Sequence, residues 1–329
     1  MKRALVTGGG GFVGLYIVRL LCEAGIDCIV LGRNHYPKAE AIGATCVQCD
    51  IRNRAAVQEA IQNVDTVFHV AALAGIWGDW DDYYQINVLG TENVVTACRK
   101  NGVQNLIYTS TPSVVFNGED ILMGDESLPY GEKILCHYQK SKIIAERHVL
   151  ENNDEVLKTC AIRPHLVWGP GDPHLIPRLL ERGRKGELKK VGSCKNLVDI
   201  SYVENVANAH ILAAKNLEST ATAAGKAYFI SQGKPVNLWD WIDELFTAFK
   251  VPPIKKRVPF TLAYTAGAIL EFGHKLCRSS KEPKMTRFLA EQLAKSHCFS
   301  IKNAVQDLAY EVEINTDDGM KRLLAGEMK

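Results

Sequence analysis

The sequence lacks an apolar run long enough to cross a membrane. Its longest apolar stretch, residues 258–270, is interrupted by proline, threonine and glycine and is followed by Glu271. Because a membrane-spanning helix needs about 20 consecutive apolar residues, we expect no transmembrane segment. An excess of charge of one sign is lacking too, since 39 lysines and arginines face 37 aspartates and glutamates. So balanced a chain has no overall signature of a nucleic-acid-binding protein, and we expect no nucleic acid as a partner.

The ten cysteines lack the spacing of a metal site. One Cys-x-x-Cys occurs, from Cys46 to Cys49, but no second pair and no histidine follows at zinc-finger distance. We interpret these two residues as buried strand thiols, with a metal or redox site as the alternative. The first residues, Met1 to Arg3, lead directly into an apolar strand pattern without a secretory segment. We therefore predict a cytoplasmic protein with free thiols and no bound metal.

What the sequence does have is size and a regular alternation of elements. Its 329 residues, 47% of them hydrophobic, can bury a sizeable core and indicate about two domains. Strand and helix patterns alternate up to Pro164, which predicts an α/β fold with a doubly wound parallel sheet of the Rossmann type. Strands are expected at residues 4–6, 28–31, 46–49, 66–70, 105–109 and 159–162, and helices at residues 12–24, 54–62, 87–101 and 138–151.

The alternation breaks down after Pro164. A loop is followed by helices and by what reads as isolated strands, such as residues 227–231. We therefore predict a Rossmann domain, mainly within residues 1–165. Residues 166–329 are expected to form mainly a smaller, mixed C-terminal substrate lobe, from which a segment near 195–215 returns to the Rossmann core.

A glycine-rich segment links the first expected strand to the first expected helix. Residues 7–14 read TGGGGFVG, with Gly8, Gly11 and Gly14 at three-residue spacing. Gly8 can take the tight turn, Gly11 lets backbone N–H groups approach a pyrophosphate, and Gly14 lets the helix pack close to the sheet. The N terminus of the helix then faces the anion. The segment predicts a dinucleotide site, with a plain tight turn as the alternative.

The second expected strand ends without a carboxylate, in Leu-Gly-Arg-Asn at residues 31–34. A free ribose 2′-hydroxyl is usually met by an acidic residue at this point, whereas a 2′-phosphate is better met by arginine. Arg33 therefore favours NADP(H) over NAD(H) as the cofactor. The alternative is that Arg33 is a solvated residue at the end of a strand.

Tyr138 and Lys142 lie four residues apart in a segment expected to be helical, and on a helix they share a face. Tyrosine has an ordinary pKa of about 10, and a neighbouring ammonium group lowers it because it stabilises the phenolate. Such a tyrosine can exchange a proton with a carbonyl or carbinol oxygen near neutral pH. Taken alone, this spacing is common on solvated helices. Its value comes from its place, one strand–helix unit after residues 108–111.

Together these residues resemble the extended short-chain dehydrogenase/reductase family, over nearly the whole chain. The features that keep the order of the family are residues 7–14, Asp50-Ile51, His69 to Ala72, Asn87, Thr109 to Thr111, and Tyr138 with Lys142. Within the family the chain is most similar to the 3β-hydroxysteroid dehydrogenase group, through residues 107–110, 114–118, 162–165, 169–173 and 196–199. This group includes sterol-4α-carboxylate 3-dehydrogenases and bacterial reductases of 2-alkyl-3-ketoalkanoic acids.

The resemblance implies roles for individual residues. Tyr138 would be the acid/base, and Lys142 would bind the nicotinamide ribose and lower the pKa of Tyr138. Thr111, with Ser110 beside it, would hydrogen-bond the substrate oxygen; the family usually has serine where Thr111 stands, and threonine keeps the hydroxyl. The implied cofactor contacts are Thr7, Gly8, Gly11, Phe12, Val13, Gly14, Arg33, Asp50, Ile51, Ala71, Ala72, Thr109, Tyr138, Lys142 and Pro164.

The resemblance also implies a reaction. We expect an NADP(H)-dependent oxidoreductase that interconverts a ketone and a secondary alcohol on a hydrophobic substrate, either 3β-hydroxysteroid-like or a long-chain β-keto acid. Family members that dehydrate sugars carry an acidic pair where this chain has Pro112-Ser113, so elimination is disfavoured. A sugar-nucleotide epimerase or reductase stays open as an alternative. A non-catalytic dinucleotide sensor is a third reading, although such sensors can lose the tyrosine or the lysine and this chain keeps both.

Two further segments bear on the substrate. An aromatic stretch at residues 76–84 follows the fourth expected strand, and ligands bind outside the carboxyl ends of strands in open α/β sheets. Trp77 and Tyr84 are therefore placed to wall a substrate pocket, with ordinary helix packing as the alternative, and His165 is a further candidate for substrate contact. The apolar residues 258–270 are flanked by cations on both sides. Such a segment can lie on an anionic membrane or gate entry of a lipid-like substrate; a core helix is the alternative.

We expect a small hydrophobic substrate as the partner. Peripheral membrane contact through the apolar segment and formation of a homodimer are left open by the sequence.

Overall fold

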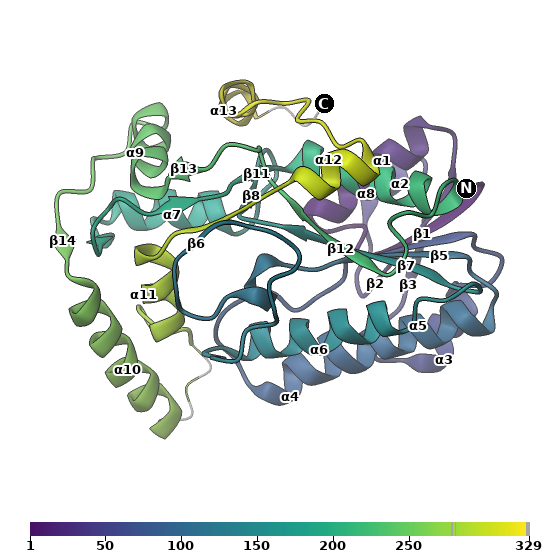
Figure 1. Ribbon diagram of the computed structural model, residues 1–329, viewed down its shortest axis with the longest axis horizontal. Coiled ribbons are helices and arrows are strands. Elements are labelled where there is room, and N and C mark those ends of the chain that lie inside the picture. The colour runs from purple at the N-terminus through teal and green to yellow at the C-terminus, as the bar shows by residue number, and fades with distance from the viewer. Residues whose placement is uncertain (278, 280, 327–329) are drawn as a thin grey trace.

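The computed structural model describes residues 1–277, 279 and 281–326, arranged around a large parallel sheet and a smaller mixed one (Figure 1). The large sheet has seven parallel strands in the order β12-β7-β5-β4-β1-β2-β3. These strands are β1 (Arg3–Thr7), β2 (Asp27–Gly32), β3 (Thr45–Gln48), β4 (Thr66–His69), β5 (Asn105–Thr109), β7 (Lys158–Pro164) and β12 (Lys226–Ile230). The strand order, which reverses between β1 and β4, confirms the predicted doubly wound α/β fold.

Both faces of the large sheet are covered by helices. Because neighbouring residues of a strand point to opposite sides, each strand contributes apolar residues to both layers. Ala4 and Val6 of β1 belong to the core cluster on the side of α1 and α8, whereas Leu5 belongs to the cluster on the side of α3, α5 and α6. The helices are α1 (Phe12–Glu23) and α8 (Val203–Glu218) on one face, and α3 (Arg54–Ala60), α5 (Gly90–Lys100) and α6 (His137–Glu151) on the other. Strand β1 is thus sandwiched between two apolar layers.

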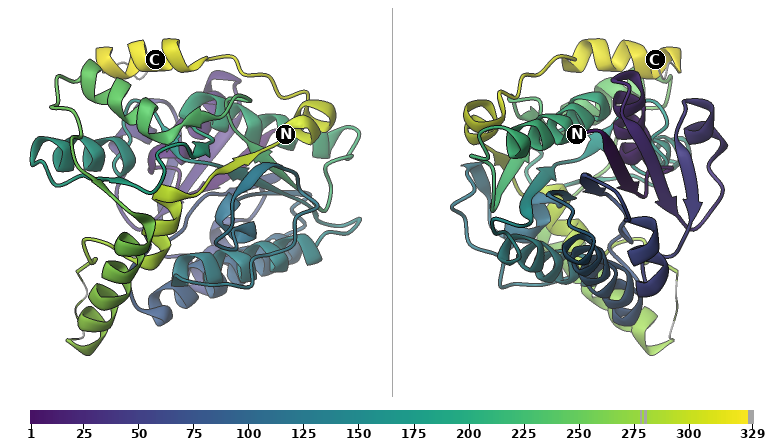
Figure 2. Two further views of the ribbon diagram at one scale, coloured as in Figure 1. Left: turned by 60° about the vertical axis from the view of Figure 1, so that its left-hand side comes forward. Right: turned by 90° about the vertical axis from the view of Figure 1, so that its right-hand side faces the viewer.

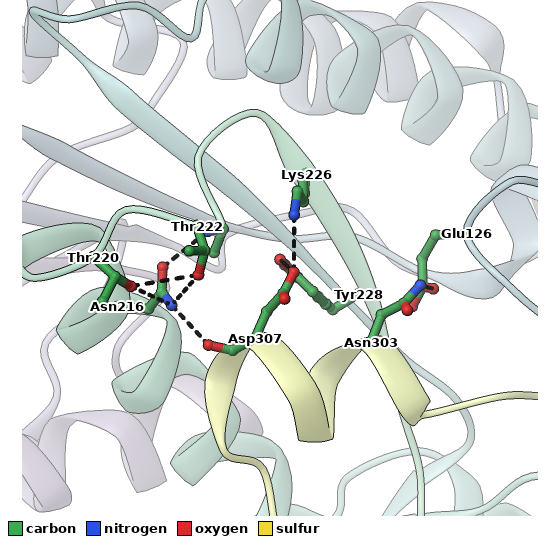
Figure 3. Close-up of polar contacts among 9 residues, drawn as sticks. Glu126, Asn216, Thr220, Thr222, Lys226, Tyr228, Asn303 and Asp307 are labelled. Carbon is green, nitrogen blue, oxygen red and sulfur yellow. Dashed lines mark hydrogen bonds and ion pairs between the residues drawn. The ribbon is translucent and has the colours of Figure 1, made fainter.

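The strand predicted near residues 227–231 is not an isolated strand of the C-terminal lobe; it is the outer strand β12 of the large sheet. That prediction is wrong because a short apolar strand shows its own burial but not its partner. The free edge of β12 is covered. Glu126 Oε1 accepts a hydrogen bond from the Phe229 backbone N–H (2.8 Å), and Asp307 of α12 (Lys302–Leu308) pairs with Lys226 (2.9 Å; Figure 3). A covered edge cannot pair with a strand of another molecule.

The smaller sheet mixes strand directions and draws on distant parts of the chain. Its strands, in spatial order, are β13 (Val236–Asn237), β10 (Leu197–Val198), β15 (His297–Phe299) and β6 (Ile121–Gly124). Strand β15 therefore lies beside a strand that precedes it by more than half the chain. Around this sheet lie the pairs β8 (Val167–Trp168) with β11 (Ser201–Tyr202) and β9 (Lys190–Val191) with β14 (Arg257–Val258).

Helices of the smaller lobe pack around a core that contains three buried tryptophans, Trp168, Trp239 and Trp241. These helices are α7 (Leu175–Arg184), α9 (Leu238–Ala248), α10 (Phe260–Leu276), α11 (Arg287–Ala294) and α13 (Thr316–Ala325). Figure 2 shows α10 projecting from the body of the molecule, at the end opposite the large sheet. In the part of the chain that the structure describes, no helix is both long and apolar enough to span a bilayer.

The remaining elements are short and lie near the ends of the large strands: α2 (Pro37–Ala41), α4 (Trp80–Tyr83), the π-helical turn η1 (Tyr84–Leu89) and the 3₁₀ helix η2 (Pro112–Val115). Elements α4, η1 and α5 form one continuous helical run. This run begins at Trp80, earlier than the predicted start at residue 87, so part of the predicted aromatic loop is helical.

Candidate active site

The predicted cofactor residues gather along one edge of the large sheet, where its strands end. Because β1, β4, β5 and β7 are parallel, their last residues, Thr7, His69, Thr109 and Pro164, lie along the same edge. Ligands of open α/β sheets bind outside the carboxyl ends of the strands, where the strand order reverses. The loops after these strands, together with α6 beside them, carry most of the site.

The loop after β1 requires glycine at two positions. Gly8 has a φ of +67°, and a Cβ there would lie 2.9 Å from the Ala71 Cα. A Cβ on Gly14 would lie 2.2 Å from the Gly8 carbonyl oxygen, so α1 reaches the loop only because Gly14 has no side chain. Helix α1 begins at Phe12, and within the described residues no side chain caps its N terminus. Its first backbone N–H groups have no helical partner and fit an anionic pyrophosphate.

Thr7 and His69 are buried and join this loop to the neighbouring one by a directed chain of hydrogen bonds. Thr91 Oγ1 donates to the Asn87 carbonyl (2.6 Å), so it accepts from His69 Nε2 (2.9 Å). His69 Nδ1 then accepts from Thr7 Oγ1 (2.7 Å), which itself accepts from the Ala71 N–H (3.2 Å). Burial lowers the pKa of His69 to about 3 and keeps the ring neutral. The Thr7 hydroxyl is thus used within the protein, where it organises the predicted cofactor loop.

Asn87 ties the loop after β4 to helix α6. Its side-chain oxygen accepts from the Leu73 N–H (2.7 Å), and its amide donates to the Leu73 carbonyl (3.0 Å) and to Ser141 Oγ (2.9 Å). Asn87 lies in the π-helical turn η1, and such turns are rare and frequent at functional sites. Since Ser141 precedes Lys142 on α6, Asn87 fixes this helix against the loop. The resemblance includes Asn87 in its motifs, but nothing in the sequence indicates this role.

Helix α6 places Tyr138 and Lys142 one turn apart. The Lys142 ammonium group donates to the Thr109 carbonyl (2.7 Å). Burial lowers the pKa of Lys142 to about 7, against the attraction of Glu146, which raises it. Burial also raises the pKa of Tyr138 to about 12, while the Thr111 hydroxyl acts in the lowering direction. This rise is opposite to the lowering expected from the sequence, because the phenol is desolvated.

Residues 109–111, at the end of β5, differ in how their hydroxyl groups are used. Thr109 Oγ1 donates to His210 Nε2 (2.8 Å), because His210 Nδ1 donates to a backbone carbonyl of α8. Thr111 Oγ1 accepts from the Ser113 N–H (3.2 Å) and so caps η2. Ser110 Oγ is buried and has no hydrogen-bond partner among the described residues. Because a buried hydroxyl without a partner is costly, Ser110 is suited to bind a polar group of a ligand.

Glu146 and Arg163 form a buried ion pair one turn beyond Lys142. Arg163 Nε and Nη2 donate to the two carboxylate oxygens of Glu146, at 2.9 and 2.6 Å. The side chains are 5% and 0% exposed. The pair gives Arg163 a structural role between β7 and α6. Glu146 was missed, because nothing in the sequence marks a partner 17 residues away.

The ends of β2 and β3 carry the residues expected to meet the adenosine part of a cofactor. Arg33 is exposed, and the Gln48 amide donates to its carbonyl (2.8 Å). Hydrogen bonds from Arg52 lower the pKa of Asp50, and the charge of Arg33 adds to this effect. Ile51 is buried. Two guanidinium groups therefore act on the region around Asp50, of which only Arg33 was expected from the sequence.

Tyr138 packs against an apolar cluster. Phe116, Cys136 and Phe288 are buried in this cluster, and Ile76, Ile121, Leu135 and Tyr138 are partly buried against it. Phe116 and Phe288 meet edge to face, with ring centres 6.1 Å apart. Because Phe288 belongs to α11 and Tyr138 to α6, the cluster joins the two parts of the molecule at the predicted acid/base.

His165 is buried next to two residues that the sequence did not mark as part of the site. Its ring lies 4.8 Å from that of His297, and its Nδ1 is 2.7 Å from the Asp199 carbonyl oxygen. Burial lowers the pKa of His165 to about 3 and raises that of Asp199 to about 7. His165 is therefore neutral and donates from Nδ1. The three residues lie after β7, after β10 and in β15, so only the fold brings them together.

The two aromatic residues predicted to contact substrate lie in different settings. Trp77 Nε1 donates to the Ser279 carbonyl (3.2 Å), which anchors the loop after β4 beside the end of α10. Tyr84 lies in η1, with its ring 5.6 Å from that of Trp80. Tyr83, which was not expected from the sequence, is buried, and its hydroxyl donates to the Gly75 carbonyl in this loop (2.8 Å). Tyr83 thus holds the loop from inside.

A doubly wound sheet with a glycine loop at the N terminus of its first helix is typical of proteins that bind a dinucleotide. The family model of the 3-beta hydroxysteroid dehydrogenase/isomerase family matches residues 5–261, and the chain belongs to this family.

Relatives extend this likeness over almost the whole chain. The chain is 47% identical to a 2-alkyl-3-oxoalkanoate reductase of Shewanella oneidensis, over 99% of this chain and 86% of that protein. It is 34% identical to the mouse sterol-4-alpha-carboxylate 3-dehydrogenase, decarboxylating, over 98% of this chain and 90% of that protein. Both relatives are named as oxidoreductases.

Solved structures agree with the fold. The crystal structure of gox2253 superposes with a TM-score of 0.79 at 24% identity and covers 99% of this chain and 98% of that one. MoeE5, solved in complex with UDP-glucuronic acid and NAD, has a TM-score of 0.75 at 23% identity, with 98% of each chain covered. At this level of identity the likeness shows the fold alone.

Proposed function

We propose that this chain is an NADP(H)-dependent oxidoreductase that interconverts a ketone and a secondary alcohol on a hydrophobic substrate. One observation carries the proposal: Tyr138 lies one helical turn from Lys142 and packs against the apolar cluster of Phe116, Cys136 and Phe288. A proton donor for a carbonyl oxygen is thus set beside buried apolar side chains, which supports an apolar substrate.

The residues present fit a nicotinamide dinucleotide. A Cβ at Gly8 or Gly14 would clash with neighbouring backbone, so these positions of the loop present only backbone groups to a ligand. Ser110 offers a buried hydroxyl without a partner among the described residues. When bound, the cofactor supplies or accepts the hydride. In the reducing direction Tyr138 gives its proton to the ketone oxygen, and the Thr111 hydroxyl holds that oxygen. Lys142 binds the ribose hydroxyls and stabilises the phenolate that Tyr138 becomes. Thr109 and Glu146 keep Lys142 in place.

The substrate we propose is either a long-chain β-keto acid or a 3β-hydroxysteroid-like molecule. The first is supported by the name of the Shewanella oneidensis relative, and the second by the name of the mouse relative. The apolar cluster at Tyr138 suits both.

The test is a comparison of substrates with the purified chain. NADPH oxidation is followed with a 2-alkyl-3-oxoalkanoate, a 3-ketosteroid and a UDP-sugar, and again with NADH. We expect turnover with one of the two hydrophobic ketones and preference for NADPH. Interconversion of UDP-sugars without net cofactor consumption would instead identify an epimerase. Cofactor binding without turnover of any substrate would identify a dinucleotide sensor.

A further inference from the structure

The ammonium group of Lys142 is buried and has few polar neighbours. The residue is only 1% exposed. An ammonium group has three N–H donors, and Lys142 gives one of them to the Thr109 carbonyl (2.7 Å), its one hydrogen-bond acceptor among the described residues. A buried charge is costly unless other groups compensate for the lost water. This charge therefore needs stabilisation from something other than hydrogen bonds within the protein.

The face of the Tyr108 ring supplies such stabilisation. The Lys142 Nζ lies over this ring, 4.1 Å from its centre. A ring face carries negative electrostatic potential, and it attracts a cation most strongly where water is excluded. Tyr108 is 1% exposed, and burial raises the pKa of its phenol well above the usual value, so the ring is uncharged. The ring attracts the ammonium group without accepting a hydrogen bond, so two N–H donors stay free for a ligand.

Ionisable groups on the neighbouring elements do not replace the ring. Glu146, one turn further along α6, raises the pKa of Lys142, but its ion pair among the described residues is with Arg163 of β7. Both of its carboxylate oxygens accept from that guanidinium group. On β4, burial and the charge of Lys142 lower the pKa of His69 to about 3, so its ring is neutral. Burial raises the pKa of Tyr138 to about 12, so the phenol is uncharged too.

The central position of β5 fixes the contact between ring and ammonium group. Tyr108 directly precedes Thr109, so one strand supplies both the ring and the carbonyl that meet Lys142. Tyr108 belongs to the core cluster on the side of α3, α5 and α6, the layer that contains the helix of Lys142. Strand β5 pairs with β4 on one side and β7 on the other. Because β5 is held on both sides, neither group can move away from α6 without distorting the sheet.

We propose that Tyr108 is a positioning residue, whose ring face keeps the Lys142 ammonium group charged and in place, with two N–H donors left for the ribose hydroxyls of the cofactor. The effect on catalysis rests on the proposed function, whereas the effect on the charge of Lys142 does not. A neutral Lys142 would no longer stabilise the phenolate that Tyr138 becomes. Loss of the ring's attraction disfavours the charged form, so it should lower the pKa of Lys142 and the highest pH at which the enzyme works.

The first experiment changes the electrostatics of the ring and keeps its shape. Tyr108→Phe is compared with a chain that carries trifluorophenylalanine at the same position, where the fluorine atoms remove most of the negative potential of the ring face. NMR of lysine isotopically labelled at Cε follows the titration of Lys142 without substrate or cofactor, and Lys142→Met assigns the signal. Tyr108→Phe should titrate as the wild type does. The fluorinated ring should lower the midpoint by about 1 pH unit relative to Tyr108→Phe.

Phe68 offers the matched control. It is fully buried in β4, but it belongs to the core cluster on the side of α1 and α8, across the sheet from Tyr108. Trifluorophenylalanine at position 68 therefore brings the same change of ring into the same sheet without facing Lys142. The midpoint of Lys142 should stay at its wild-type value in this control.

The second experiment measures kcat/KM for ketone reduction with NADPH against pH. The fall of activity on the alkaline side should move to lower pH by about 1 unit with the fluorinated ring and with Tyr108→Leu, which has no ring face. Tyr108→Phe should keep the wild-type profile. A ring that only fills space would lower the rate by the same factor at every pH and leave the profile in place. The fluorinated ring decides the result if Tyr108→Leu, which leaves a cavity, does not fold.

Equal midpoints for Lys142 in Tyr108→Phe and in the fluorinated chain would overturn the proposal. An equal shift in the Phe68 control would overturn it too, because the effect would not depend on the ring beneath Lys142. A shifted midpoint with an unmoved pH profile would overturn the positioning role in catalysis. If the wild type reduces no ketone, the proposed function fails, while the NMR titration still decides whether Tyr108 stabilises the charge.

Discussion

Tyr138 is surrounded by groups that keep its proton in place. Burial in the apolar cluster raises its pKa to about 12, and the Lys142 ammonium group is held by the Thr109 carbonyl. A protonated phenol at neutral pH is a proton donor, which suits ketone reduction more than alcohol oxidation. The setting of this one residue therefore fits the proposed role of Tyr138 as the proton donor in ketone reduction.

Replacing the phenol tests the role of Tyr138 directly. Tyr138→Phe should lower the rate of ketone reduction by about 10² to 10⁴, the usual contribution of a positioned general acid. Affinity for NADPH, measured by fluorescence titration, should stay within about twofold because the ring remains. A variant that reduces ketones at a nearly normal rate would contradict the assignment.

The exposed guanidinium group of Arg33 should decide cofactor choice. Arg33→Ala should raise the Michaelis constant for NADPH by roughly 10- to 150-fold, equivalent to about 1.5–3 kcal/mol for hydrogen bonds to a charged group. The constant for NADH should change little. Lys38→Ala, which removes another exposed cation in the nearby helix α2, is the control for a general charge effect. Equal damage to both cofactors would show that Arg33 holds its loop and does not read the phosphate.

At the scale of single residues, a role could be predicted from the sequence where it follows from local spacing. Gly8 and Gly14 are needed where the pattern places them, and Tyr138 and Lys142 share a helical turn. Glu146, Asp199 and His297 could not be predicted, since their partners come from strands that are distant in the sequence. The pKa of Tyr138 was expected to fall, and it rises because desolvation depends on side chains that only the fold supplies.

The first turn of α1 depends on the absence of a side chain at Gly14. Gly14→Ala would place a Cβ 2.2 Å from the Gly8 carbonyl oxygen, so the loop or the helix must move. We expect NADPH binding to weaken at least about tenfold, since the backbone N–H groups no longer converge on one anion. Gly273→Ala, in α10 with open space around it, is the control. It should keep NADPH binding and stabilise the fold by up to about 1 kcal/mol. Unchanged binding in Gly14→Ala would contradict this account.

Element boundaries were predictable where hydrophobic periodicity is undisturbed. The predicted helix at residues 12–24 is α1, and the strand at residues 105–109 is β5. The helical run that begins at Trp80 was missed because its first turns look like an aromatic loop. Helix α10 extends to Leu276, past the apolar residues 258–270 that the sequence marked, because Glu271 turns inward to Arg287. The partner of a strand was not predictable, as β12 shows.

At the scale of the whole molecule, Asp199 lies where the two sheets meet. Its carbonyl accepts from His165 after β7 of the large sheet, and its carboxylate accepts from the Phe299 N–H (2.6 Å) of β15 in the smaller sheet. Burial raises its pKa to about 7 from an ordinary value of 3.8. The folded chain therefore holds this proton more tightly than the unfolded chain, and the stability that it contributes is present below pH 4 and lost between about pH 4 and 7.

This linkage predicts how stability depends on pH. Asp199→Asn cannot lose a proton, so it should gain stability relative to the wild type as pH rises from 5 to 7, by up to about 1.4 kcal/mol per pH unit. Above about pH 7 the difference should level off. Urea unfolding of both proteins at several pH values measures it. A difference between the two proteins that is the same at pH 5 and pH 8 would contradict the buried, protonated carboxyl group.

The position of β15 in the smaller sheet has a consequence for how the protein is made. Strand β15 fills the place between β10 and β6, yet β6 ends at Gly124 and β15 begins at His297. At a synthesis rate of about 5–20 residues per second, β6 waits on the order of 10–35 s on the ribosome for its neighbour. Contacts of such long range form late and slowly. During this interval Ile121 and Leu122 have no strand beside them, and a chaperone that shields this segment would have its strongest effect then.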